Sequence, residues 1–256
     1  MLDRKHKKLQ GILKDNRRVL IAFSGGVDSS LLARVAKEAL GRNALAVTID
    51  CEMVPRRELK GARAMAKAIG IKHRAVKYRM LKNKEFTRNP QNRCYYCKRK
   101  IMGILLEAAE KEGSVLMDGT NADDVRGRRP GLKALRELGV LSPLAMAGIS
   151  KNEARKLSRK LGLRNYDRPE MTCLATRIPT GETITKERLK RIEKAEEFLQ
   201  GLRIRDLRVR DHDNIARIEV KREKFKIIFN NREKIIKEFK GLGFSHVCLD
   251  MEGRDE

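Results

Sequence analysis

The sequence has 256 residues, with 59 Lys and Arg against 34 Asp and Glu, which gives a formal net charge of +25 at pH 7. Its hydrophobic fraction of 41% excludes a disordered chain, and no run approaches the ~18 uncharged apolar residues that a transmembrane helix needs. Residues 181–256 carry 19 basic and 16 acidic side chains, so nearly all of the excess lies in residues 1–180. This local excess favours a polyanionic partner, although a solvated basic surface explains it equally well.

Short apolar runs alternate with helical periodicities along the first 120 residues. This alternation predicts an α/β fold with a parallel sheet covered on both faces, and ligands bind such sheets beyond the carboxyl ends of the strands. The predicted strands are 19–23, 44–49, 71–76 and 114–117, and the predicted helices are 29–40, 58–69 and 98–111.

The pattern changes towards the C-terminus. Ser150 and Glu153 form a capping-box pattern at the start of a predicted helix over 150–161, and an irregular stretch follows over 166–181. We therefore expect two domains, a nucleotide-binding domain over 1–182 and a small α+β domain over 183–256. In the second domain we predict helices over 185–199 and 232–239, a hairpin over 207–220 turning at Asp213 and Asn214, and a strand over 244–249.

A six-residue string, SGGVDS, joins the first strand to the first helix. Two glycines allow close approach of the backbone to an anion, and the loop amides then point at it together with the helix N-terminus. An aspartate in such a loop can hold Mg²⁺, and no Gly-Lys-Ser/Thr ending makes it a Walker A loop. The residues of this predicted phosphate site are Ser24, Gly25, Gly26, Val27, Asp28 and Ser29.

The SGGVDS string resembles the signature of the PP-loop family of ATP pyrophosphatases. The resemblance implies that ATP, with Mg²⁺, is cleaved between its α- and β-phosphates to attach AMP to a substrate oxygen. It also implies that Thr48 lies near the adenine and ribose, and that Gly119, Thr120 and Asn121 lie near the nucleotide. The acidic pair at 123–124 fits either that second segment or a solvent-exposed turn.

The five cysteines are an odd number, and the charged first eight residues are followed by no signal-like apolar run. We expect a cytoplasmic protein without a disulfide framework. The C-x-x-C pair Cys94 and Cys97 fits a redox pair, a zinc site or, with Cys173 as third ligand, an iron–sulfur cluster that leaves one iron open. The cluster is the favoured hypothesis. Cys248 is predicted to be a core residue and Cys51 to be structural.

A longer series of motifs resembles the LarE family of ATP-dependent sulfur transferases, over essentially the whole chain. The resemblance implies adenylation of a carboxylate of pyridinium-3,5-biscarboxylic acid mononucleotide and its conversion to a thiocarboxylate. Some members sacrifice the sulfur of the cysteine that matches Cys173, and others use a [4Fe-4S] cluster on three cysteines, as this sequence would. Thr176 stands where the family more often has Ser. The motifs are NRCYYCK (92–98), RRPG (128–131), SPL (142–144), CLATRIP (173–179), RVR (208–210) and ARIE (216–219).

Residue roles follow from this resemblance. Arg177 is predicted to face the substrate or an adenylate phosphate, and Cys173 is the second catalytic candidate beside Asp28. Arg208 and Arg210 alternate along a predicted strand, so both would face one side, where the resemblance implies the substrate phosphate. Glu197 is a candidate substrate-binding residue, although a solvated helix charge is an equal alternative.

The favoured function is therefore an enzyme acting on a small carboxylate and phosphate substrate, with sulfide delivered by an upstream donor. A [4Fe-4S]-dependent tRNA thiolase is the runner-up, since a strongly basic region suits RNA. A third hypothesis is a non-catalytic protein that binds nucleic acid or carries an iron–sulfur cluster. The intact nucleotide loop disfavours it, since a carrier needs no such loop. The LarE resemblance also implies a homo-oligomer.

Overall fold

The computed structural model describes residues 1–127, 130–169 and 172–254, so Arg128 and Arg129 of the RRPG motif lie outside it. The chain forms two compact units. The first contains Met1–Tyr78 and Asn92–Met171, and the second contains Arg79–Gln91 and Thr172–Glu256. The sequence predicted a single division near residue 182, whereas in the structure the short excursion over 79–91 and the segment from 172 belong with the C-terminal unit.

A four-stranded parallel sheet forms the centre of the first unit, in the order β3-β2-β1-β4, which confirms the predicted α/β fold. The central strand β1 is apolar and its first three residues are fully buried, because both faces of a parallel sheet are covered. Since β2 and β4 flank β1 on opposite sides, the chain changes direction at the carboxyl end of β1, where such sheets bind ligands. The strands are β1 (Val19–Ala22), β2 (Ala44–Asp50), β3 (Lys72–Lys77) and β4 (Val115–Met117).

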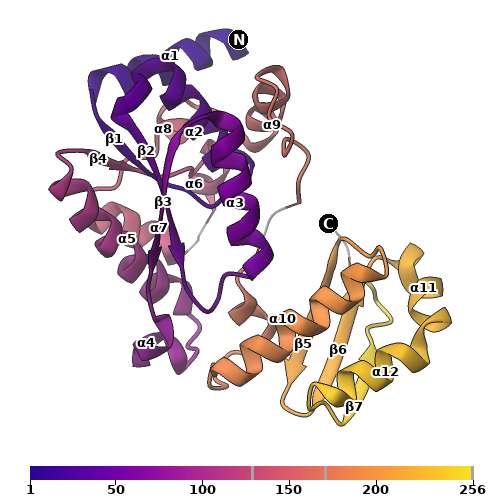
Figure 1. The fold of residues 1–256 in the computed structure, drawn as a ribbon. Coiled ribbons are helices and arrows are strands. Elements are labelled where there is room, and N and C mark those ends of the chain that lie inside the picture. The colour runs from indigo at the N-terminus through magenta and orange to yellow at the C-terminus, as the bar shows by residue number, and fades with distance from the viewer. Residues whose placement is uncertain (128–129, 170–171, 255–256) are drawn as a thin grey trace. The chain divides into compact units, whose positions relative to one another are not determined.

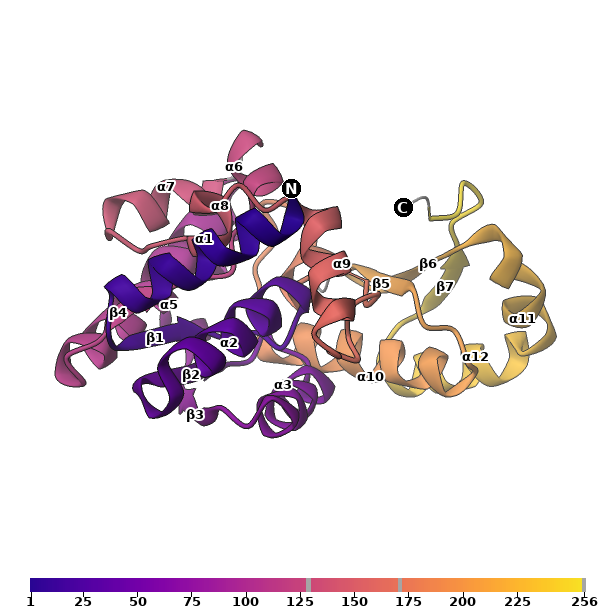
Figure 2. The same cartoon turned by 90° about the horizontal axis from the view of Figure 1, so that it is seen from above.

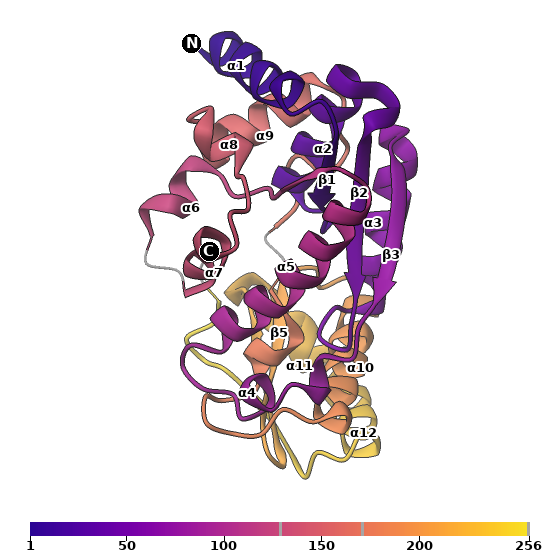
Figure 3. The ribbon, with the colours of Figure 1, turned by 90° about the vertical axis from the view of Figure 1, so that its left-hand side faces the viewer.

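Helices cover both faces of this sheet (Figure 1). Helices α2 (Val27–Leu40) and α3 (Arg56–Ile69) pack on one face, and α5 (Arg93–Lys111) packs on the other. Helix α7 (Pro130–Glu137) lies along α5 (Figure 3). Outside α2 lie α1 (Leu2–Asp15) and α9 (Lys151–Lys160); the two short helices α6 (Ala122–Arg126) and α8 (Pro143–Met146) complete the unit.

Local signals explain several of these helix ends. The predicted capping box is confirmed at α9, where the Glu153 amide donates to Ser150 Oγ and the Ser150 amide donates to a Glu153 carboxylate oxygen. Gly70 ends α3 in the left-handed conformation, as a C-terminal glycine does. Helix α1 was not predicted, because the first eight residues of the chain are largely charged and hide the amphipathic periodicity of the helix.

The second unit is built on a three-stranded sheet in the order β5-β6-β7. The predicted hairpin is confirmed, with Asp213 at positive φ in its turn. The excursion over 79–91 carries η2 (Met80–Lys82) and α4 (Lys84–Thr87), and it is held by the buried Asn89, whose amide group donates to the carbonyls of Ile178 and Pro179. The strands are β5 (Leu207–His212), β6 (Ile215–Val220) and β7 (His246–Leu249); the helices are α10 (Lys186–Gly201), α11 (Phe225–Asn230) and α12 (Arg232–Gly241).

The two faces of this second sheet differ. Alternate residues of β5 are buried towards α10, and α12 packs beside α10 and against β7, so both helices run along one side of the sheet in Figure 2. The residues of β5 between the buried ones face the other side. The same alternation makes the prediction for Cys248 wrong. On the edge strand β7, Val247 and Leu249 pack against the core, while Cys248 lies opposite Arg217 and is exposed.

None of the helices in the described part of the chain has the length and apolar character needed to cross a membrane.

Candidate active site

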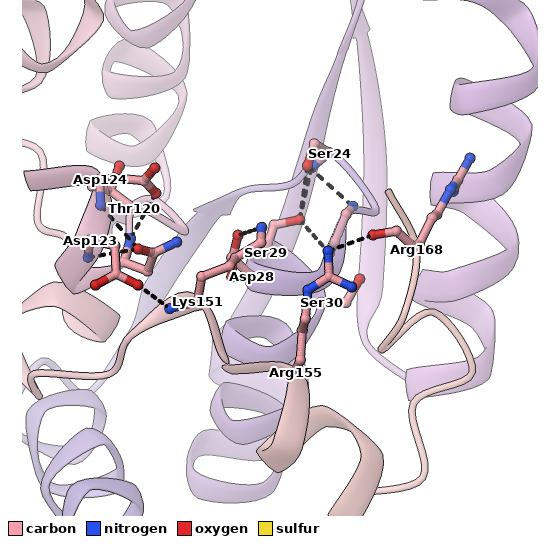
Figure 4. A network of polar contacts seen from close by, with 12 residues as sticks. Ser24, Asp28, Ser29, Ser30, Thr120, Asp123, Asp124, Lys151, Arg155 and Arg168 are labelled. Carbon is pink, nitrogen blue, oxygen red and sulfur yellow. Dashed lines mark hydrogen bonds and ion pairs between the residues drawn. The ribbon is translucent and has the colours of Figure 1, made fainter. Parts of the chain in front are cut away.

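The SGGVDS loop leads from the end of β1 into the first turn of α2, with Gly26 at the N-cap. Its two serines close it, because Ser24 Oγ and Ser29 Oγ lie 3.0 Å apart and the Gly26 amide donates to Ser24 Oγ over 3.2 Å (Figure 4). The first amides of a helix have no intrahelical acceptor and carry the positive end of the helix dipole. This end of α2 is therefore built to hold an anion.

Two glycines explain how the surrounding backbones approach this loop. Gly25 has φ +75°, and a Cβ there would lie 2.7 Å from the Cα of Ala62 in α3. A Cβ on Gly119, after β4, would lie 2.8 Å from the backbone nitrogen of Ser29. The absence of both side chains thus lets α3 and the loop after β4 pack directly on the phosphate loop.

A lysine that the sequence analysis missed lies at Asp28. Lys151 Nζ is 2.6 Å from Asp28 Oδ2, and the backbone amide of Lys151 donates to Asp123 Oδ2 over 2.8 Å (Figure 4). Lys151 comes from α9, 123 residues along the chain, so no local motif could have revealed it. The Asp28 carboxylate, which was predicted to hold Mg²⁺, thus already pairs with a cation, the Lys151 ammonium group. Carboxylate oxygens are ligands that Mg²⁺ prefers, so Asp28 fits that ion.

The loop after β4 is held mainly by its own side chains. Buried Asp118 accepts from the Thr120 amide and hydroxyl, and Asn121 and Asp124 form a capping box at α6. Thr120 and Asn121 therefore shape this loop, and Gly119 brings it against Ser29. The Asp124 side chain therefore takes part in the helix cap, and it does not simply point into solvent from an acidic turn.

The hydroxyl of Thr48 is used inside the sheet. It donates to the Phe23 carbonyl over 2.7 Å and lies 2.8 Å from His73 Nε2, so it must accept from that nitrogen. His73 therefore carries its proton on Nε2. Burial, and then the charge of Arg63, lower the pKa of His73 below its ordinary value of 6.5. The group connects β2, β3 and the residue that follows β1. The prediction that Thr48 faces the adenine therefore gains no support from its side chain.

A strap between α9 and residue 169 also holds the phosphate loop. The buried amide of Asn165 donates to the Gly25 carbonyl and to Ser30 Oγ, both over 3.0 Å. Arg168 forms an ion pair with Glu58 of α3 over 2.6 Å. Arg155 donates to the Arg168 carbonyl (Figure 4). Sequence patterns do not identify these residues, because an irregular stretch carries no periodicity that would indicate its contacts.

The cysteine pair lies on α5, which begins at Arg93, five residues earlier than predicted. Cys94 is exposed and Cys97 is half-buried, and their i,i+3 spacing places them on one side of the helix. Cys173 belongs to the second unit. Within the described residues of either unit, no three His, Cys, Asp or Glu side chains gather around a common metal position.

Cys173 is the N-cap residue of the 3-10 turn η3 (Leu174–Arg177), and Arg177 is the last residue of that turn. The guanidinium of Arg177 is 4% exposed, pairs with Glu196 of α10 over 2.8 Å, and donates to the carbonyls of Thr172 and Cys173. The sequence predicted that Arg177 faces the substrate or an adenylate phosphate. The structure instead buries it and directs its donors at the chain around Cys173.

A buried acid that the sequence did not identify, Glu196, lies next to the predicted residue on α10. The predicted residue, Glu197, is exposed on α10. Glu196 lies in the buried stripe of that helix with Leu189, Ile192 and Leu199, and is 1% exposed. An acid at an apolar position of the periodicity was the signal that could have identified it.

Arg208 and Arg210 lie on one face of β5, as their alternation predicts. Arg210 pairs with Glu219 over 2.8 Å and donates to the Thr176 carbonyl over 2.7 Å, so this strand contacts the cysteine loop. Arg208 has no ion-pair partner among the described residues. Burial, and then the charges of Arg254, Arg177 and Arg210, lower the pKa of Arg208, which marks a site where an added anion would be stabilised.

Comparison with known proteins adds to this geometry. The asparagine synthase family profile matches residues 10–127, from α1 through the phosphate loop to α6. An uncharacterized protein of Synechocystis sp. is 41% identical, over 99% of this chain and 96% of its own length. An uncharacterized protein of Methanocaldococcus jannaschii is 36% identical, over 96% and 95%. The pyridinium-3,5-bisthiocarboxylic acid mononucleotide synthase of Lactiplantibacillus plantarum is 34% identical, over 97% of this chain and 91% of its own.

Proposed function

Because the chain belongs to the PP-loop family of ATP pyrophosphatases, we propose that it is an ATP-dependent sulfur transferase that converts a carboxylate of a phosphorylated small molecule into a thiocarboxylate. The proposed substrate is pyridinium-3,5-biscarboxylic acid mononucleotide. The observation that carries the proposal is the second unit's arrangement, in which the loop of Cys173 contacts the arginine strand through Thr176 and Arg210. The similarity to the Lactiplantibacillus plantarum synthase extends over both units and supports the substrate class.

The first proposed step is adenylation. A carboxylate oxygen of the substrate attacks the α-phosphorus of ATP, the bond to the bridging oxygen breaks, and pyrophosphate leaves. The amides of the Ser24–Ser29 loop and the N-terminus of α2 bind the phosphates, and Asp28 would hold Mg²⁺, which offsets their charge. Lys151 lies at Asp28 and adds a second positive charge to this end of the sheet.

The second proposed step is displacement. Sulfide attacks the activated carbonyl carbon, the carbon–oxygen bond to AMP breaks, and the thiocarboxylate and AMP are formed. Arg208 and Arg210 bind the phosphate of the substrate and orient its ring. Thiolates are the ligands that iron–sulfur clusters require, and the side chains of Cys94, Cys97 and Cys173 are all at least partly accessible. They would hold a [4Fe-4S] cluster, which would supply the sulfide.

The sulfur source is tested by anaerobic purification, followed by assays of iron, sulfide and visible absorption. We expect about four irons per chain, lost in each of Cys94→Ala, Cys97→Ala and Cys173→Ala. Cys248→Ala is the matched control. Cys248 is also exposed, but it lies on β7 and is not a proposed ligand, so this variant should keep its iron. Absence of iron from the parent protein would contradict the cluster, and loss of one H₂S from Cys173 after turnover would then identify that residue as a sacrificial donor.

The reaction class is tested separately by ATP–pyrophosphate exchange. We expect exchange only when the carboxylate substrate is present, and a thiocarboxylate product by mass spectrometry when sulfide is supplied. Exchange without formation of a sulfur-containing product would leave the family assignment intact and contradict the proposed sulfur transfer.

A further inference from the structure

The most deeply buried ion pair of the described residues lies beside Cys173. The side chains of Arg177 and Glu196 are 4% and 1% exposed, and they meet in two parallel contacts, Nε to Oε1 over 2.8 Å and Nη2 to Oε2 over 3.2 Å. Removing two charges from water costs free energy that the pairing only partly returns, and well-packed apolar residues often stabilise as much. Stability alone therefore does not explain the pair.

The remaining donor group of Arg177 holds the backbone on both sides of the cysteine. Its Nη1 donates to the carbonyls of Thr172 over 3.1 Å and Cys173 over 3.3 Å, and to Thr176 Oγ1 over 3.0 Å. The chain from 172 to 177 thus wraps around one guanidinium group. Because carbonyls on either side of the Cys173 Cα are fixed, the direction of its side chain is restricted as well.

Two contacts connect this loop to β5. Glu196 Oε1 also accepts from the backbone amide of Val209 over 3.2 Å, at the free edge of the strand. The next residue, Arg210, donates to the Thr176 carbonyl over 2.7 Å. The cysteine loop is therefore tied at two points to adjacent residues of the strand that carries Arg208 and Arg210.

We infer that Arg177 and Glu196 are positioning residues, which hold the Cys173 thiol at a fixed place relative to the Arg208–Arg210 anion site. The inference rests on the proposed role of Cys173 in sulfur transfer. It gives Arg177 a different task from the direct contact with substrate that its place in the sequence suggested. A displacement of about 1 Å at a reacting group can cost about 100-fold in rate, so a rigid loop is a requirement of the chemistry.

The decisive experiment replaces both charges together. The double variant Arg177→Met with Glu196→Leu leaves no buried charge unpaired, so it should fold and melt close to the parent temperature, while losing every contact to the 172 and 173 carbonyls. The matched control is Arg232→Met with Glu233→Leu, an exposed ion pair in the same unit. We expect a fall of about 100-fold in kcat for sulfur transfer in the first variant, with KM for ATP unchanged, and no change in the control.

A second readout follows the thiol itself and needs no turnover. In a background with Cys94, Cys97 and Cys248 replaced by Ser, Cys173 is the accessible cysteine, because Cys51 is only 3% exposed. Alkylation of Cys173 by iodoacetamide should become about tenfold faster in the double variant, as expected for a loop that opens more readily. A folded double variant with parental alkylation and parental kcat would overturn the inference.

The two readouts separate the inference from the proposed function. If the parent transfers no sulfur, the proposed function fails, and the alkylation rate alone decides whether the pair positions the thiol. If the double variant does not fold, Arg177→Lys takes its place, since it keeps the charge next to Glu196 but lacks the planar set of donors that reaches both carbonyls. Faster alkylation in a stable Arg177→Lys variant supports the inference, and an unchanged rate overturns it.

Discussion

The two regions proposed to bind anions are built by opposite means. At the phosphate loop of the first unit, backbone amides and a helix N-terminus would bind the anion, and glycines at 25 and 119 let neighbouring backbones approach. At β5 of the second unit, guanidinium groups would bind, and Arg210 is placed by an ion pair with Glu219 and by the carbonyl of Thr176, 34 residues away. The first region should lose its structure when a Cβ is added to a glycine, and the second unit should lose stability when a buried charge is removed.

The largest effect is expected at Gly25. In Gly25→Ala the new Cβ meets the Cα of Ala62 at 2.7 Å, at a φ of +75° that L-residues avoid, and neither backbone can move away cheaply. We expect a loss of at least about 3 kcal/mol in the free energy of unfolding, and loss of ATP binding. Denaturant unfolding and calorimetric titration with ATP measure the two quantities.

Gly11→Ala is the control for that substitution. Gly11 lies in α1 with no atom within 4 Å of the added Cβ, so the variant should be up to about 1 kcal/mol more stable than the parent. Parental ATP affinity in Gly25→Ala would break the comparison, because the loop would then tolerate a side chain where two backbones meet.

The next effect concerns a charge in the second unit. Asp211 is completely buried and pairs with Arg188 over 2.8 Å and Arg191 over 2.6 Å, which connects α10 to the hairpin. Asp211→Asn removes the buried carboxylate shared by both guanidinium groups; Arg188 keeps Glu182, but Arg191 loses its ion pair, so the variant should cost about 3 kcal/mol in the free energy of unfolding. Asp213→Asn, in the adjacent turn at positive φ, is the control and should be nearly neutral. Equal stability of the two variants would show that charge pairing does not organise this unit.

The contrast also explains what the sequence could reveal. The phosphate loop, the order of strands and helices around it, the hairpin and the capping box at Ser150 follow from patterns within a few residues, and the structure confirms these elements. Lys151, Asn165 and Glu196 act through contacts to residues 123, 140 and 19 positions away, respectively. No local pattern encodes such pairs. Cys248 was misplaced for a related reason: an apolar run does not tell which of its alternate residues face solvent on an edge strand.

A smaller effect is expected where a side chain supports the backbone-built loop. Asn165→Asp removes the amide donor to the Gly25 carbonyl and Ser30 Oγ, and places a carboxylate beside the phosphate site. Losing hydrogen bonds at a buried group costs about 1–3 kcal/mol, so the Kd for ATP should rise at least about tenfold. Calorimetric titration checks this value. Asn16→Asp, which loses one amide donor to the Ile12 carbonyl at the end of α1, should leave the Kd unchanged. An unchanged Kd in Asn165→Asp would show that the glycines and serines hold the loop unaided.

The smallest effect is a pH dependence at His73. Because its pKa is lowered in the folded state, the unfolded chain binds a proton first as the pH falls through about 6.5. The stability that neutral His73 contributes is therefore fully present above that pH and is lost as the pH falls from there to the folded-state pKa. The difference in melting temperature between the parent and His73→Gln should change over this range and be constant above it. A difference that does not change with pH would contradict the assigned burial.

The tautomer sharpens this last test, because the proton on Nε2 is present in both the neutral and the charged imidazole. The hydrogen bond from His73 to Thr48, and through it the position of the Phe23 carbonyl before the phosphate loop, should survive protonation. Lowering the pH should thus reduce stability through His73 while its substitution leaves the pH dependence of ATP affinity unaltered. If His73→Gln instead changes that dependence, the imidazole acts on the nucleotide directly rather than through the Phe23 carbonyl.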